Sequence, residues 1–423
     1  MPLVLGRLWW RGRKEPGYRQ HWNERLGLYR ARAANDEPLT IWVHAVSVGE
    51  TRASEPLVDA LLKRYPQARI VLTCMTPTGR ATGKSLFGKH GARVVQSYLP
   101  YDLPGLVGRF ITHFQPRLCI LMETEVWPNL IAQCRRRKVP VALANARLSE
   151  RSLRKGLRFG GIMREAAQGI SYVAAQTDAD ALRIRTLGVA NVGVTGSIKF
   201  DVMVPQAALD TGAQLRGQFG ARPVFLCAST REGEEGMILE AFMHARAAPA
   251  GALAADVLLL IVPRHPQRFD EVEAMIRERG LGVVRRSALV LPGVAGVSGV
   301  SDDTAVVLGD SMGEMFAYYS ACDLAFIGGS LQPLGGQNLI EPAALGKPVL
   351  VGQHTFNFAQ ATEDCLQEGG AVRVSGADEL MREAGRLLAD GAAREAMGRQ
   401  ALVFANRHRG ATARTLALLP ALD

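Results

Sequence analysis

The chain has 423 residues, of which 48% are hydrophobic and 21% charged, and this apolar fraction supports a packed core and excludes wholesale disorder. Its length suggests two or three domains, and the lack of a 20–50-residue repeat excludes fibres and solenoids. The formal net charge of +10 points to an anionic partner, and no uncharged apolar stretch is long enough to span a membrane.

Residues 1–40 form the first predicted region, a basic and aromatic arm. Residues 1–33 contain eight basic residues, two acidic residues and three of the chain's five tryptophans. Because tryptophan and arginine are both stable in a lipid headgroup region, we expect the arm to associate with a membrane surface. A solvated arm packed on the first domain is the alternative. Nucleic acid is a weaker candidate partner because no known binding motif is present.

Six predicted strands follow in the first half of the chain. Each is an apolar run bounded by glycine, proline or polar residues, and helical patterns lie between them. The strands are 41–46, 69–75, 93–99, 117–123, 140–146 and 171–176. This alternation is typical of a doubly wound α/β domain, which we assign to residues 41–202. The loosely patterned stretch that follows is assigned as a linker at 203–222.

The alternation restarts in the second half and predicts another α/β domain at 223–423. Its strands are 223–230, 256–264, 282–287, 305–311, 324–330, 348–352 and 371–375. The last helical stretch, roughly 377–420, is long enough to reach back across the junction. Two such domains in tandem predict a central cleft between the carboxyl ends of their sheets, where ligands of doubly wound sheets bind.

Glu50 follows the first strand and opens a helix in the motif HAVSVGETRAS. A carboxylate at a helix N-terminus is expected to stay ionised at neutral pH and to face the cleft, although an acid there also stabilises a helix that has no other role. The string AVSVG also resembles a nucleophile elbow around Ser47. A hydrolase would need a histidine and an acidic residue as partners of the serine. His354 is available, but no motif identifies an acidic partner.

Other polar residues follow strands in the first domain. Glu123 and Glu125 end the fourth strand in METEVWPN, and two acids there are costly to bury without a use. Lys199 in GSIKFD is expected near the cleft, with a plain surface lysine as the alternative. TPTGRATGKS (76–85) is one residue short of a phosphate-binding P-loop and predicts an ordinary strand–turn–helix. Asp-Ala-Asp at 178–180 predicts a helix N-cap, not a metal site.

Five loops follow strands in the second domain: CASTREGEE, VPRHPQRF, GDSMGEM, IGGSL and GGQNLIEPAALGKP. Four lead into helices, whose free backbone N–H groups suit an anionic phosphate. Glu341 in the fifth loop can accept hydrogen bonds from ribose hydroxyls. A dinucleotide dehydrogenase is disfavoured because no GxGxxG motif exists. The six scattered cysteines lie mostly in apolar runs and predict buried, reduced thiols, with neither a disulfide framework nor a zinc site.

Taken together, the blocks HAVSVGE, MTPTG, LPYDLP, METEVWPN, ANARLS, GSIKFD, VPRHPQRF, GDSMGE, FIGGSL and GGQNLIEPAALGKPVLVG resemble, in order, the 3-deoxy-D-manno-octulosonic acid (Kdo) transferases of Gram-negative bacteria. The likeness runs from about residue 7 to the C-terminus. It implies the GT-B architecture of two Rossmann-like α/β domains, and an inverting glycosyltransferase with no metal or other cofactor. The implied reaction moves Kdo from CMP-Kdo to the tetra-acylated lipid A precursor at the cytoplasmic face of the inner membrane.

The resemblance also implies roles for single residues. Glu50 matches the general base, and Glu123 and Lys199 match positions that stabilise the transition state. The positions that match the CMP-binding loops are Pro263, Arg264, Met312, Gly313, Glu314, Asn338, Leu339, Ile340 and Glu341. One departure is Gln337, which stands where many relatives have histidine and cannot carry charge. Relatives also have a longer apolar lead at the N-terminus, so a longer native anchor is expected.

A second basic patch lies at residues 135–164, which contain ten basic residues and one acidic residue. We expect residues 135–138 and 147–158 of this patch to meet the phosphates of the lipid acceptor. Two alternatives stay open. One is a GT-B enzyme that uses a UDP-sugar, and the other is a membrane-bound basic scaffold that binds anionic lipid without turnover.

Overall fold

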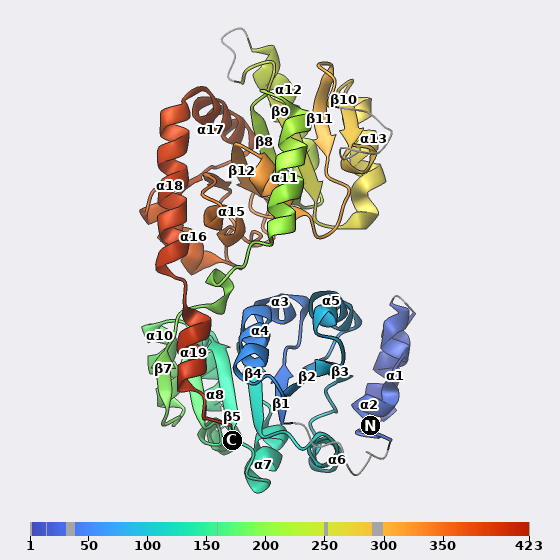
Figure 1. Cartoon of the computed structure of the whole chain (residues 1–423), viewed down its shortest axis with the longest axis vertical. Helices are drawn as coiled ribbons and strands as arrows, with labels where there is room; N and C mark the ends of the chain where they lie inside the picture. The colour runs from blue at the N-terminus through green and yellow to red at the C-terminus, as the bar shows by residue number, and fades with distance from the viewer. Residues whose placement is uncertain are drawn as a thin grey trace. The chain divides into compact units, whose positions relative to one another are not determined.

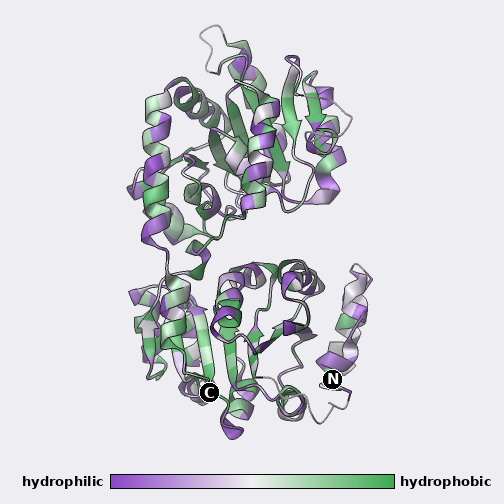
Figure 2. Ribbon diagram, viewed as in Figure 1, coloured by the Kyte–Doolittle hydropathy of each residue, from purple (hydrophilic) through white to green (hydrophobic). Residues whose placement is uncertain are grey.

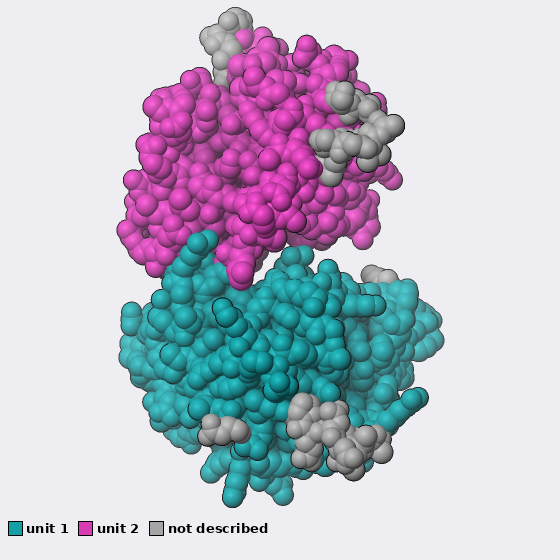
Figure 3. Space-filling model, viewed as in Figure 1, with its two compact units in different colours: residues 1–201, 408–423 teal, residues 202–407 magenta. Residues whose placement is uncertain are grey.

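The computed structural model describes residues 2–13, 15–30, 39–158, 160–248, 253–289 and 299–422. The chain divides into two compact units (Figure 3). Unit 1 consists of Met1–Asp201 and His408–Asp423, and unit 2 consists of Val202–Arg407. Each unit is built around its own parallel sheet. The predicted cleft between the domains stays a prediction.

Unit 1 contains a seven-stranded sheet in the order β3-β2-β1-β4-β5-β6-β7, in which every neighbouring pair is parallel. The strand order reverses between β1 and β4, so the chain forms a switch point there. The strands are β1 (Thr40–His44), β2 (Arg69–Cys74), β3 (Val94–Tyr98), β4 (Leu118–Met122), β5 (Val141–Ala146), β6 (Tyr172–Ala175) and β7 (Val192–Val194).

The central strands of unit 1 are apolar throughout because helices cover both faces of the sheet. Successive residues of a strand point to opposite faces. Trp42 of β1 packs in one core cluster with Val71, whereas its neighbour Ile41 packs in the other with Ile70. Figure 2 shows the result: apolar residues gather along the strands, and polar residues occupy the outer faces of the helices.

The helices of unit 1 begin at clear sequence signals. The side chains of Ser47, Thr76 and Thr177 accept N–H groups at the starts of α3, α5 and α10, and proline lies in the first turn of α4 to α7. The helices are α1 (Pro2–Arg11), η1 (Pro16–Arg19), α2 (Trp22–Arg25), α3 (Val48–Ala53), α4 (Glu55–Arg64), α5 (Pro77–Phe87), η2 (Gly88–Arg93), α6 (Pro104–Phe114), α7 (Pro128–Arg136), α8 (Glu150–Arg158), α9 (Gly160–Gln168), α10 (Asp178–Thr186), η3 (Ile198–Phe200) and α19 (Ala411–Leu418).

Unit 2 contains a second parallel sheet of seven strands, in the order β10-β11-β9-β8-β12-β13-β14. Its switch point lies between β8 and β12. The strands are β8 (Val224–Thr230), β9 (Leu258–Pro263), β10 (Gly282–Arg285), β11 (Thr304–Leu308), β12 (Leu324–Ile327), β13 (Val349–Val351) and β14 (Ala371–Arg373). The predicted α/β fold class is confirmed, and each predicted strand has a counterpart. The three-residue edge strand β7, Val-Gly-Val, was missed because its pattern is too short to distinguish from a loop.

The helices of unit 2 are α11 (Gln206–Phe219), α12 (Glu234–Ala247), η4 (Pro266–Arg268), α13 (Phe269–Glu278), η5 (Arg286–Ala288), α14 (Met315–Ala321), α15 (Ile340–Ala344), α16 (Ala359–Gln367), α17 (Ala377–Ala389) and α18 (Gly391–Arg407). Helix α11 corrects the predicted linker at 203–222. Its Leu215 and Phe219 are buried in the core of unit 2, and Gly212 lies so close to Ser320 that a Cβ atom there would clash. The segment therefore packs as part of the unit.

Much of the predicted N-terminal arm packs on unit 1. Arg25 is buried, lies over the ring of Tyr98 and donates to the carbonyl oxygen of Met75 at 3.1 Å. Trp9 and Trp10 of α1 are instead 49% and 61% exposed. Residues 31–38 of the predicted arm lie outside the described residues. Among the residues that are described, no helix is long and apolar enough to cross a membrane.

The C-terminal residues return to unit 1 through α19 (Figure 1). Arg64 of α4 donates to the carbonyl oxygen of Leu416 at 2.8 Å, and Arg414 donates to that of Thr195 at 2.8 Å. Ala411 is buried in the same core cluster as Ile198. The end of the chain therefore packs beside the turn that carries Lys199.

Candidate functional site

Glu50 lies in the first turn of α3, which follows β1 at the switch point of unit 1. The backbone N–H of Val46 donates to its Oε2 at 2.8 Å, and the hydroxyl of Ser47 donates to its Oε1 at 3.0 Å. The backbone N–H of Glu50 in turn donates to Ser47 Oγ at 3.4 Å. This reciprocal pattern is close to a capping box. It fixes the orientation of the carboxylate and makes Ser47 the N-cap of α3. A stabilising role for Glu50 in the first turn of the helix is therefore also present.

Glu50 is not simply ionised at neutral pH, contrary to the sequence-based expectation. Its pKa is raised to about 7, chiefly by burial and also by the charges of Glu125 and Glu123, against the lowering effect of its hydrogen bonds. Burial likewise raises the pKa of Glu125. The helix N-terminus is outweighed because desolvation destabilises the charged form. A carboxylate with a pKa near 7 is well matched to accept a proton at physiological pH.

Glu123 and Lys199 form an ion pair beside this carboxylate. Lys199 Nζ lies 2.8 Å from Glu123 Oε1, and both side chains are largely shielded from solvent. Glu123 follows β4, the strand adjacent to β1, and its φ of +59° is unusual for a residue with a side chain. The structure thus brings Glu50, Glu123 and Lys199 to one edge of the sheet, where the loops that follow the strands lie.

Asn145 was not singled out from the sequence, yet it supports this group. It is fully buried at the end of β5, with a φ of +54°. Its Oδ1 accepts the backbone N–H of Ile198 at 3.0 Å, and its Nδ2 lies 3.5 Å from Glu123 Oε1. An asparagine inside the apolar strand VALANA was the available signal, because a buried amide must find partners.

The turn that carries Lys199 is held from its other side by the C-terminal segment. Asp201 accepts the backbone N–H of Gly410 at 2.6 Å and that of Thr412 at 2.5 Å, at the start of α19. The ring of Phe200 stacks on His408 with a centroid distance of 4.6 Å. The acidic end of the SIKFD block therefore anchors the returning helix, which in turn restrains Lys199.

The predicted basic patch separates into two parts. Arg147 and the cations of α8 follow β5 and lie at the carboxyl edge of the sheet, the edge that carries Glu50. Residues 135–138 end α7 before β5 begins, and so lie at the opposite, amino edge. Six residues of β5 span about 17–20 Å between the two. Only the α8 part shares an edge with the candidate catalytic group.

In unit 2 the predicted nucleotide-binding residues lie in three loops at the carboxyl edge. Pro263 ends β9, and Arg264 follows it with its N–H donating to Thr230 O at 2.9 Å. Met312 is 56% exposed, Gly313 has a φ of +86°, and Glu314 directly precedes α14. Because β9 pairs with β11, the first two loops are neighbours.

The third loop leads into α15. Asn338 Oδ1 accepts the N–H of Ile340 at 3.0 Å, and its Nδ2 donates to Glu341 Oε1 at 3.1 Å. Leu339 and Ile340 are each 1% exposed. These two residues can offer a ligand only backbone atoms, because their side chains lie in the core. Gln337 donates its N–H to Gly328 O at 3.0 Å, which ties this loop to the end of β12.

The loops after β8 and β12 do not leave all their N–H groups free for a phosphate, contrary to the prediction. Glu234 is fully buried, and its carboxylate accepts N–H groups from Arg231 at 2.9 Å, Gly329 at 2.6 Å and Leu331 at 3.0 Å. Its neighbour Glu235 is also buried, and both of its carboxylate oxygens accept a hydrogen bond from Arg268 Nη1 at 2.8 Å. The protein's own carboxylates occupy this position and fix the surrounding loops.

A cluster of positive charge lies beside those loops. Burial lowers the pKa of His265, and the charges of Arg231, Arg264 and Arg268 lower it further. Three guanidinium groups close enough to affect one imidazole create a local site that suits phosphate. Of the three arginines, Arg268 already forms ion pairs with Glu235 and Glu271.

The remaining motifs have structural roles. TPTGRATGKS is the expected strand–turn–helix with Thr76 as the cap, and Thr177 rather than Asp178 is the N-cap of α10. Asp180 is buried and accepts the N–H of Leu148 at 2.9 Å. All six cysteines are buried and free, as predicted. Within the described part of the chain, no group of His, Cys, Asp and Glu side chains could hold a metal ion.

Comparison with solved structures gives the fold. A UDP-GlcNAc 2-epimerase from Neisseria meningitidis aligns with a TM-score of 0.58 at 15% identity, over 90% of this chain and all of that chain. The Anabaena protein HepE aligns with a TM-score of 0.56, also at 15% identity, over 90% of this chain and 100% of its own. These likenesses confirm the two-domain α/β architecture of the GT-B type.

Sequence comparison gives the family. The family model of the 3-deoxy-D-manno-octulosonic-acid transferases matches residues 20–202. The chain is 46% identical to 3-deoxy-D-manno-octulosonic acid transferase of Bordetella pertussis, over 98% of this chain and 95% of the relative. It is 39% identical to the enzyme of the same name from Haemophilus influenzae, over 99% of this chain and 95% of that one. The chain therefore belongs to the Kdo transferase family of lipopolysaccharide biosynthesis and is a glycosyltransferase.

Proposed function

We propose that this enzyme transfers Kdo from CMP-Kdo to the tetra-acylated, bis-phosphorylated lipid A precursor, with inversion at the anomeric carbon. The observation that carries the proposal is the group at the switch point of unit 1. Glu50 has a pKa near 7, and the Lys199–Glu123 ion pair lies beside it. This arrangement supplies a proton acceptor and a fixed dipole at the edge of the sheet where ligands bind.

The proposed reaction begins at the acceptor hydroxyl. Its oxygen attacks the anomeric carbon of Kdo, its proton passes to the carboxylate of Glu50, and the bond from the anomeric carbon to the CMP phosphate oxygen breaks. The electron pair of that bond leaves on CMP. Because the transition state resembles an oxocarbenium ion, inversion requires the base and the leaving group on opposite faces of the sugar.

Lys199 and Glu123 are proposed to stabilise the charge that develops during transfer. A preorganised ion pair in a shielded site acts strongly on a nearby transition state, because it does not have to reorient during the reaction. The hydrogen bonds from Asn145 and the anchoring of Asp201 on α19 hold the pair in place. No metal enters the proposed scheme.

The loops of unit 2 are proposed to bind the CMP portion of the donor. The residues concerned are Pro263, Arg264, Met312, Gly313, Glu314, Asn338, Leu339, Ile340 and Glu341. The arginine cluster beside His265 supports a phosphate at this edge. Backbone groups of the third loop and the carboxylate of Glu341 are the proposed partners of the nucleoside.

Arg147 and four basic residues of α8 are proposed to bind the phosphates of the acceptor. All are exposed, and they lie at the same edge as Glu50: Arg147, Arg151, Arg154, Lys155 and Arg158. We also propose that the enzyme works at the cytoplasmic face of the inner membrane, with Trp9 and Trp10 of α1 in the headgroup region. Their exposure supports this location.

The direct test is product formation by purified enzyme. With CMP-Kdo and the lipid acceptor, the mass of the lipid should rise by one or more Kdo units and CMP should be released. The anomeric configuration of the product, read by NMR, should be opposite to that of the donor. A lipid that bound but gained no mass would favour the scaffold alternative.

A thermal-shift measurement separates the donor classes. A ligand that binds only the folded protein raises its stability by about 2.7 kcal/mol at a hundred times its Kd. CMP should therefore raise the melting temperature and UDP should not. The reverse result would support a UDP-sugar donor.

A further inference from the structure

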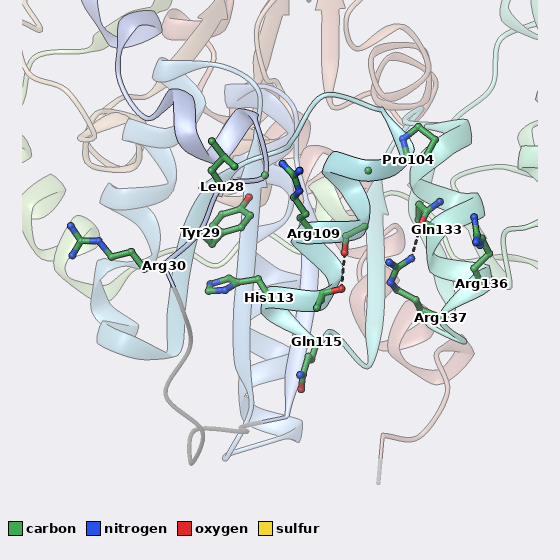
Figure 4. Close-up of a pocket in the computed structure, with 14 residues that line it drawn as sticks. Leu28, Tyr29, Arg30, Pro104, Arg109, His113, Gln115, Gln133, Arg136 and Arg137 are labelled. Carbon is green, nitrogen blue, oxygen red and sulfur yellow. Dashed lines mark hydrogen bonds between the residues drawn. The ribbon is translucent and has the colours of Figure 1, made fainter.

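An open groove lies on unit 1. It has a volume of about 810 Å³ and lies between the segment after α2, the length of α6 and the carboxyl-terminal half of α7 (Figure 4). Its lining includes neither Glu50, Glu123 and Lys199 nor any residue of unit 2. The groove therefore belongs to neither the donor loops nor the Glu50 group.

The walls of the groove are strongly basic. Arg30, Arg109, Arg136 and Arg137 line it together with His113, and none of the described lining residues is acidic. Figure 4 shows these guanidinium groups spread along the groove, with Arg30 and Arg136 at its two ends. Arg137 donates to Gln133, whereas the other three arginines have no ion-pair or hydrogen-bond partner for their side chains among the described residues. Such a concentration of exposed positive charge attracts anions.

Two glycines let the walls approach each other. Gly27 has a φ of +62°, and a Cβ atom there would lie 2.7 Å from the carbonyl oxygen of Leu106. At Gly108 a Cβ atom would lie 3.0 Å from Arg137 Nη2. The floor is formed where the ring of Tyr29 stacks on His113, with a centroid distance of 4.7 Å. The groove is therefore built by close packing of three segments and not by a loose surface chain.

The rim of the groove is apolar as well as basic. Leu28 is 49% exposed on the lining, and Leu103, which precedes Pro104 of the lining, is 43% exposed. Guanidinium groups beside exposed aliphatic side chains suit a boundary between phosphates and acyl chains. A small soluble anion would account for the arginines but not for the exposed leucines.

We propose that this groove binds the headgroup phosphates of anionic phospholipids and is a second contact of the enzyme with the bilayer, besides the tryptophans of α1. The arginines supply the charge, and Leu28 and Leu103 meet the upper part of the acyl region. The proposal concerns binding without acceptor or donor, so it stands or falls independently of the proposed transfer reaction.

The test uses the full-length enzyme and vesicles of phosphatidylcholine with or without phosphatidylglycerol. The double variant Arg109→Ser, Arg136→Ser should bind the anionic vesicles roughly tenfold or more weakly at low salt, because each basic residue near such a surface contributes about 1 kcal/mol. The matched control Lys63→Ser, Arg382→Ser removes the same charge from exposed positions elsewhere. It should bind as the wild type does.

Three outcomes would overturn the proposal. Equal losses in both double variants would show that net charge alone governs binding. Unchanged vesicle binding in the groove variant, together with loss of binding to free glycerol phosphate, would assign the groove to a soluble phosphate ligand. A large loss of transfer to detergent-dispersed acceptor would place the groove in the transfer site. Support requires that the groove variant lose vesicle binding and keep detergent-phase turnover within twofold.

Discussion

The two sheets have the same number of strands and each has a switch point near its centre, yet they use charged side chains differently. In unit 1 the carboxylates of Glu50 and Glu123 lie at the edge, partly shielded, with one pKa near 7 and one ion pair. In unit 2 the carboxylates of Glu234 and Glu235 are fully buried and bind their own loops. The first arrangement leaves its carboxylates partly exposed, whereas the second fixes the positions of backbone atoms.

This difference follows from what each unit is proposed to do. A general base must exchange a proton, so its carboxylate cannot be neutralised by a close cation or buried completely. A loop that binds a nucleotide must hold its N–H groups still, and a buried carboxylate that accepts several N–H groups does this well.

Glu50→Gln should lower kcat by roughly 10²–10⁴-fold, because the amide keeps the shape of the side chain but cannot accept the proton. CMP binding, read by thermal shift, should be unchanged because the loops proposed to bind CMP belong to unit 2. The control is Glu55→Gln, which changes the same residue type at the start of the adjacent helix α4 and should leave kcat unaltered. Near wild-type turnover of the Glu50 variant would move the base to Glu123 or Glu125.

Arg268→Ala should destabilise the protein by about 3 kcal/mol, because it leaves the buried Glu235 without its cation. Chemical denaturation followed by circular dichroism measures the change. Arg264→Ala, in the same cluster, should weaken CMP binding with little effect on unfolding. If Arg268→Ala were as stable as the wild type, the buried carboxylates of unit 2 would not be the structural supports described above.

The raised pKa of Glu50 has a cost in stability. Between pH 4.5 and about 7 the folded state binds more protons than the unfolded state, so the free energy of unfolding falls as pH rises through this range. Glu50→Gln removes this loss. The variant should be more stable than the wild type at pH 8, by at most about 3 kcal/mol, and the difference should be smaller at pH 5.

Melting curves of both proteins across that pH range provide the measurement. His44 does not account for a transition near pH 7, because burial lowers its pKa to about 4. The same ionisation should appear in turnover, with kcat rising as pH increases through about 7, since the base must be deprotonated. A stability difference that did not change with pH would contradict the raised pKa.

Replacing Arg151, Arg154 and Arg158 of α8 with serine should raise the acceptor KM roughly tenfold, because exposed charge contacts are each weak. CMP binding should not change. The matched control is Arg135→Ser with Lys138→Ser, at the opposite edge of the same sheet, and its acceptor KM should stay at the wild-type value. Equal effects of the two sets would mean that the edge of the sheet does not decide which cations meet the acceptor.

The strands and the positions of most loops were predictable from the sequence. Apolar runs such as RLCILM are long, contrast sharply with their flanks and are buried on both faces, so their pattern survives without tertiary information. The roles proposed for Glu50 and Lys199 come from motif blocks that resemble a family. Sequence comparison confirmed the family, and the roles of these residues stay predictions. The edge strand β7 and helix α11 could not be separated from loop by pattern alone, because one is too short and the other carries few apolar residues.

Two parallel α/β sheets, the order of the motifs and the residue types available for chemistry can be read from the chain alone. Which charges meet depends on the folded arrangement. Glu50 was expected to be ionised because its local neighbour is a helix N-terminus, but its pKa depends on burial and on Glu123 and Glu125, which are more than 70 residues away. The basic patch that is continuous in sequence was divided by one strand, because β5 carries the chain from one edge of the sheet to the other. Electrostatic interactions act through space, so the sequence lists the charges but only the fold determines their distances.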